Sequence, residues 1–66
     1  SIHALIPQGQ DGLLTFTDLS GKGMARHACR GGSELVVSPA WPRGIYLALW
    51  EGSNSWHRIK ILFNPN

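Results

Sequence analysis

The chain has 66 residues, of which 42% are hydrophobic and 15% are charged, with a formal net charge of +2. This length allows one small domain, and the composition is too apolar and too weakly charged for intrinsic disorder. Its six basic residues are spread along the chain, whereas a nucleic-acid partner would require a dense basic face. We therefore expect no nucleic-acid partner, and we expect residues 1–66 to be one module of a larger protein.

Short apolar segments alternate with turn residues along the whole chain. In the second segment Leu14 and Phe16 alternate with two threonines, which is the period of a half-buried strand. No stretch repeats apolar residues at helical spacing, so we predict an all-β sandwich or barrel of about six short strands. The predicted strands are Ser1–Ile6, Leu13–Thr17, Gly23–Cys29, Glu34–Ser38, Ile45–Trp50 and Trp56–Phe63.

The last two segments, Ile45–Trp50 and Trp56–Phe63, flank the polar connector Glu51–Ser55 and predict an antiparallel hairpin. Alternate positions on both faces of Ile45–Trp50 are apolar. Two explanations fit this pattern: the strand is buried on both faces, or its second face is covered by another domain.

No group of residues has the spacing of a known catalytic or metal site. The three histidines do not match zinc motifs, and Cys29 is the only cysteine that could join them. Cys29 and His27 could act as a nucleophile and a base, but no orienting acid accompanies them, and a small buried cysteine is the commoner case. We expect no metal, no cofactor and no enzymatic activity in this chain.

Three of the six aromatic residues are tryptophans. Trp50 and Trp56 flank the hairpin connector and can pair across it as a purely structural contact. The alternative is a ligand platform, because flat aromatic rings stack on sugars. Trp41 stands between two prolines in a connector, and we expect it to be the most exposed of the three.

Three short motifs together resemble a known family. A strand ends in Asp-Leu-Ser-Gly-Lys, a later strand begins with Gly-Ile-Tyr, and the last strand contains Lys-Ile-Leu. In this order and spacing, over roughly residues 13–63, they resemble the C-terminal sorting domains of the type IX secretion system. The residues that carry the resemblance are Asp18, Leu19, Ser20, Gly21, Lys22, Gly44, Ile45, Tyr46, Lys60, Ile61 and Leu62.

The resemblance implies an immunoglobulin-like β-sandwich that is not catalytic and acts as an export address. Domains of this family follow ordinary export to the periplasm and are read by an outer-membrane translocon in Bacteroidetes and related bacteria. The expected partners are therefore the outer-membrane secretion machinery and the preceding domain of the parent protein. The expected location is outside the cell or on its surface, and the terminal hairpin is the expected recognition surface.

Two departures from the family pattern keep a second function open. The family opens with an apolar-Tyr-Pro-Asn-Pro strand, where this chain has Ser1–Pro7 (SIHALIP). In addition, Trp41, Trp50 and Trp56 are heavier than the residues usual in the family. The alternative is an accessory module of a secreted glycan-degrading enzyme that binds a polysaccharide or packs against a neighbouring domain.

Overall fold

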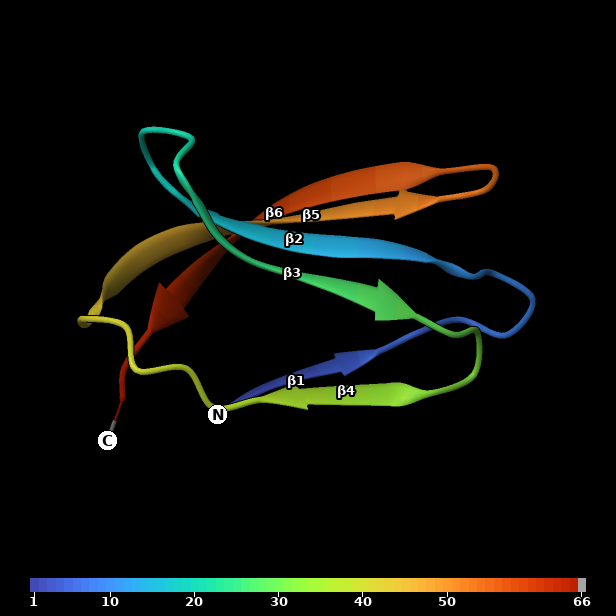
Figure 1. The fold of residues 1–66 in the computed structure, drawn as a ribbon, viewed down its shortest axis with the longest axis horizontal. Coiled ribbons are helices and arrows are strands. Elements are labelled where there is room, and N and C mark those ends of the chain that lie inside the picture. The colour runs from blue at the N-terminus through green and yellow to red at the C-terminus, as the bar shows by residue number, and fades with distance from the viewer. Residues whose placement is uncertain (66) are drawn as a thin grey trace.

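A computed structural model describes residues 1–65 of the chain as six strands without a helix. The strands are β1 (Ile2–Leu5), β2 (Gly12–Asp18), β3 (Gly23–Cys29), β4 (Glu34–Val37), β5 (Gly44–Gly52) and β6 (Trp56–Phe63). They form a two-stranded sheet, β1-β4, and a four-stranded sheet, β3-β2-β5-β6, in which every pair is antiparallel (Figure 1). The predicted all-β sandwich is confirmed.

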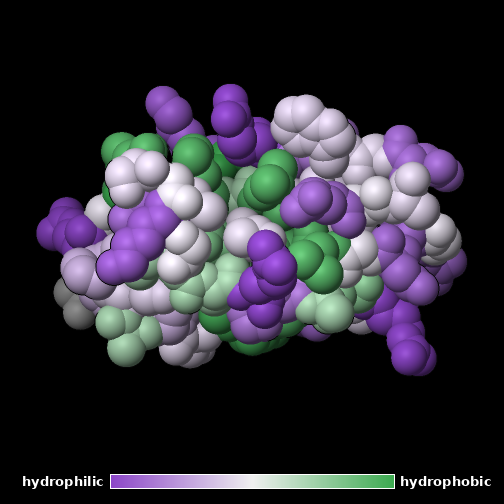
Figure 2. Space-filling model, turned by 45° about the horizontal axis from the view of Figure 1, so that its top comes forward, coloured by the Kyte–Doolittle hydropathy of each residue, from purple (hydrophilic) through white to green (hydrophobic). Residues whose placement is uncertain are grey.

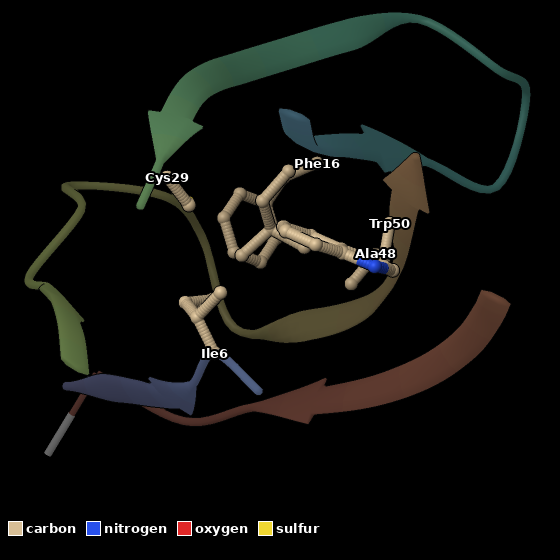
Figure 3. Packing of buried hydrophobic residues seen from close by; sticks show 6 residues of the cluster. Ile6, Phe16, Cys29, Ala48 and Trp50 are labelled. Atoms are coloured by element: carbon tan, nitrogen blue, oxygen red, sulfur yellow. The ribbon is translucent and has the colours of Figure 1, made fainter. Parts of the chain in front are cut away.

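The core lies between the two sheets and is built from alternate residues of β2 and β5. Leu14 and Phe16 on β2 face inward, as do Ala48 and Trp50 on β5, because residues two apart in a strand share one face. Phe16 is the most deeply buried of them, with 1% of its surface exposed. Figure 3 shows Phe16, Ala48 and Trp50 gathered with Ile6 and Cys29 in the interior, and these five residues and Leu14 form the buried cluster.

Strand β3 lacks an obvious apolar face in the sequence, and its pairing with β2 explains why. Thr17 lies opposite Gly23 while Phe16 lies opposite Ala25, so Met24 is an extra residue in a β-bulge. The bulge shifts the alternation by one position. Met24 and Ala25 therefore both pack against the core, although they are adjacent in the sequence.

Within residues 1–65, the structure excludes the first of the two explanations for the apolar faces of β5. On the inner face Tyr46, Ala48 and Trp50 are buried, whereas on the outer face Ile45 is 46% exposed and Leu47 is half-buried. The strand is thus not buried on both faces within this chain. No helix in the described part of the chain is long and apolar enough to cross a membrane.

Candidate functional site

The three sequence motifs meet at one end of the four-stranded sheet. Asp18, which opens the turn after β2, lies opposite Tyr46 on β5, and Tyr46 lies opposite Ile61 on β6. On the outer face Ile45 lies opposite Leu62, and Leu47 lies opposite Lys60. The turn after β2 and the two strands of the terminal hairpin are therefore neighbours across two ladders.

The turn from Asp18 to Lys22 is held by its own first residue. One carboxylate oxygen of Asp18 accepts hydrogen bonds from the Ser20 hydroxyl at 2.6 Å, the Ser20 amide at 2.9 Å and the Lys22 amide at 3.0 Å. The Ser20 hydroxyl first, and then the Lys22 amide, hold the pKa of Asp18 below its ordinary value. Gly21 has a φ of +91°, which residues with a side chain rarely adopt.

An exposed apolar surface surrounds this end of the sheet. Leu19 is 59% exposed, Ile45 is 46% exposed and Leu62 is 77% exposed. A hollow of about 370 Å³ joins Leu19 to Leu47 and Lys60 and is also lined by Arg58 and Ile59. We call Leu19, Ile45, Leu47, Lys60 and Leu62 the motif surface. Figure 2 shows hydrophobic residues exposed among hydrophilic ones on one face of the molecule.

Two motif residues of the hairpin, Tyr46 and Ile61, lie on the inner face, behind the motif surface. Tyr46 is 6% exposed, and its hydroxyl donates a hydrogen bond to the Pro42 carbonyl at 2.6 Å. Its ring packs against Trp41 at 4.9 Å between centroids and against Phe63 at 6.1 Å. Ile61 packs against the buried cluster. Tyr46 and Ile61 therefore position the hairpin and do not offer a free side chain.

The three tryptophans do not form one platform. Trp50 is 9% exposed, and Trp41 packs against Phe16 and Tyr46 with centroid distances of 5.5 and 4.9 Å. Trp56 is the most exposed of the three, at 68%, and Trp41 is partly buried. The expectation that Trp41 is the most exposed is wrong, because this residue is partly buried against the core by its contacts with Phe16, Tyr46 and Phe63. The expected cross-strand pair is also wrong, because Trp56 lies opposite Glu51 and Trp50 lies opposite His57.

Cys29 and His27, which we considered as a nucleophile and a base, pack in or against the core and do not contact each other as such a pair would. Cys29 is 8% exposed, and burial raises the pKa of its thiol. Its sulfur lies 3.6 Å from the backbone carbonyl oxygen of His27, so this contact does not involve the imidazole ring. The His27 ring packs edge-on against Phe16 at 6.2 Å. Within residues 1–65, no three His, Cys, Asp or Glu side chains gather in a cluster that could hold a metal.

Sequence reasoning did not single out Leu47, Arg58 and Ile59, which line the hollow beside the motifs. The alternation of Ile45, Leu47 and Leu49 was the signal that could have indicated this surface. The sequence alone does not show which face of β5 is covered by the core. Comparisons with protein-family models, curated proteins and solved structures found no match.

Proposed function

We propose that this domain is a non-catalytic sorting domain that directs a secreted bacterial protein across the outer membrane through the type IX secretion system. The machinery in the outer membrane reads the domain after the parent protein has reached the periplasm. The parent protein ends outside the cell or on its surface, with its preceding domain next to this one. On this proposal the function is one of binding, and the domain performs no chemistry.

One observation supports the proposal more than any other: the three motifs that resemble the sorting family lie together. Asp18 is opposite Tyr46 on the inner face and Ile45 is opposite Leu62 on the outer face, so the three motifs lie side by side at one end of the sheet. At this end of the sheet Leu19 and Leu62 are 59% and 77% exposed, whereas apolar residues that only build the core would be buried. Exposed apolar residues beside a cation are typical of a surface that binds another protein.

Secretion of a reporter tests this function directly. A fluorescent protein with an ordinary export signal is fused in front of the 66-residue chain and expressed in a bacterium that has the type IX system. We expect the fusion outside the cells, and we expect it to stay in the periplasm of a strain that lacks the outer-membrane translocon. The reporter without the domain is the control. Periplasmic retention of the fusion in both strains would contradict the proposal.

A second candidate function, polysaccharide binding, is favoured by one residue only. Trp56 is 68% exposed and lines a hollow of about 340 Å³ with Leu49, Glu51 and Gly52. A sugar ring could stack on the indole while the Glu51 carboxylate accepts a hydrogen bond from a hydroxyl. We place this candidate second because Trp50 is buried and Trp41 is partly buried against the core, so Trp56 has no second exposed tryptophan beside it to extend the stacking surface.

The polysaccharide candidate has a separate test. Affinity electrophoresis of the chain through gels that contain plant polysaccharides detects retardation by a bound glycan. If the domain binds glycans, Trp56→Ala abolishes the retardation, whereas Trp41→Phe, which keeps an aromatic ring in the core, leaves it unchanged. Unretarded migration of the parent chain in every gel would exclude this candidate among the glycans tested.

A further inference from the structure

Ile59 on β6 is exposed although it lies on the inner face of its sheet. It is opposite Ala48, which is 5% exposed, and cross-strand neighbours share a face. Ile59 is nevertheless 60% exposed. The two-stranded sheet therefore does not cover this part of β6, and an apolar side chain that faces the interior remains in contact with water.

An apolar groove continues from Ile59 along the side of the sandwich between β1 and β6. Two hollows, of about 410 and 250 Å³, lie along it and share Ala4 and Leu14 in their linings. The first is lined by Ile59 and Ile61 of β6, and the second extends to His57 and Trp50. We call this feature the seam; Figure 3 shows β1 and β6 on the same side of the core.

Both strands that border the seam have a free edge there. β6 pairs only with β5, and β1 pairs only with β4, within residues 1–65. At the hairpin turn the Gly52 amide donates to the Ser55 carbonyl at 2.7 Å. Because hydrogen bonding alternates along an antiparallel strand, the amides and carbonyls of Arg58, Lys60 and Leu62 point away from β5. These groups are available to an additional strand.

The charges beside this edge specify the chemistry of that strand. Arg58 and Lys60 lie on the outer face, opposite Leu49 and Leu47, whereas Ile59 and Ile61 lie on the inner face. A strand paired with β6 would place alternate residues beside the two cations and the intervening residues over the two isoleucines. The residues that line the seam include no carboxylate. The carboxylate of Glu34 on β4 lies 3.3 Å from the ring of His3, which lines the first hollow.

We propose that the seam binds an extended peptide strand in which acidic residues alternate with apolar ones, by addition to the free edge of β6. Backbone hydrogen bonds hold the strand, its apolar side chains fill the two hollows, and its carboxylates pair with Arg58 and Lys60. A second copy of this chain is a poor occupant, because pairing β6 with another β6 sets these cations against each other. This proposal does not rest on the sorting function.

Nuclear magnetic resonance titration of the 66-residue chain tests the proposal. The probe is a synthetic peptide of about six residues, the length of an ordinary strand, with alternating valine and glutamate. We expect the largest amide shifts at Arg58, Lys60 and Leu62. A peptide with lysine in place of glutamate is the control for charge, and it should bind at least tenfold more weakly.

Two pairs of variants locate the binding site. Ile59→Thr should weaken binding about fivefold, because it removes apolar contact inside the seam, whereas Ile45→Thr on the outer face should leave binding unchanged. Arg58→Gln should lower both the affinity and its dependence on salt, and Arg26→Gln on β3 should not.

Three results would overturn the proposal. The first is no binding of the glutamate peptide up to its solubility limit. The second is equal binding of the two peptides, or equal loss in the Ile59→Thr and Ile45→Thr variants. The third is a dimer in sedimentation that the peptide does not dissociate, since a second copy would then occupy the seam. None of these results bears on secretion of the reporter, so the two proposals fail separately.

Discussion

At the scale of single residues, Asp18 shows how one side chain fixes the shape of the motif surface. Its carboxylate accepts three hydrogen bonds from Ser20 and Lys22, and the Asp18 amide donates to the Lys22 carbonyl at 3.0 Å. Such local bonds are the reason that Asp and Ser favour turns. The closed turn keeps Leu19 exposed beside Leu47.

The lowered pKa of Asp18 makes the stability of the turn dependent on pH. The fold favours the charged carboxylate, so its contribution is present above the unfolded pKa of about 4 and is lost as the pH falls through the lower folded pKa. We expect Ser20→Ala to raise the pKa of Asp18, as measured by the carboxyl carbon shift, because the largest cause is removed. Ser53→Ala, in the hairpin turn, is the control. An unchanged Asp18 pKa in Ser20→Ala would contradict this explanation.

Gly12 is required by a close approach between strands. A Cβ atom at this position would meet the Glu51 carbonyl and would lie 2.7 Å from the Trp50 ring. We predict that Gly12→Ala lowers the free energy of unfolding by about 1–3 kcal/mol, because the core must shift to accept the methyl group. Gly23→Ala is the matched control, since a Cβ there has no atom within 4 Å. Equal unfolding free energies of the two variants in urea would show that the contact is not limiting.

At the scale of elements, all six strands were predicted with bounds that differ by two residues at most, although Gly23–Cys29 has no clear apolar face and was predicted from its context alone. Turn residues such as those in Asp18–Lys22 limit each strand, and these signals are local. Which residues of β6 face the core could not be predicted equally well. We expected a five-residue connector, Glu51–Ser55, whereas β5 continues to Gly52 and β6 follows at Trp56. The position of the turn decides which residues oppose each other, and it sends Trp50 inward and Trp56 outward.

Quenching of tryptophan fluorescence by iodide tests this arrangement of the hairpin. Trp50 is 9% exposed and Trp56 is 68% exposed, so Trp56 should account for most of the quenchable emission. We predict that Trp56→Phe removes most of the quenching, while Trp41→Phe leaves it largely intact. Quenching that is as strong in Trp56→Phe as in the parent chain would mean that another tryptophan is open to solvent.

At the scale of the whole molecule, the order of the strands in the sheets was not predictable from the sequence. Each ladder except those of the two hairpins joins distant segments, for example β1 with β4 and β2 with β5. Alternation indicates that a strand has an apolar face but not which partner covers it. The motif surface could be predicted in part, since the motifs were recognisable, but their meeting at one end of the sheet required the β2–β5 ladder.

The same topology leaves two regions of this small molecule exposed and apolar. One is the motif surface on the outer face, where Ile45 and Leu62 lie opposite each other, and the other is the seam beside Ile59. The two regions adjoin along β6, where Ile59 and Lys60 line a hollow of each, so Ile45→Thr on the outer face is the variant that changes the motif surface alone.

Secretion of the reporter fusion by two leucine variants tests the central claim most directly. Leu62 and Leu5 are 77% and 81% exposed, but only Leu62 belongs to the motif surface. We predict that Leu62→Ser lowers secretion about fivefold or more, as expected for an important contact residue, while Leu5→Ser secretes normally. Normal secretion of Leu62→Ser, or an equal loss in both variants with both chains folded, would contradict a recognition role for the motif surface.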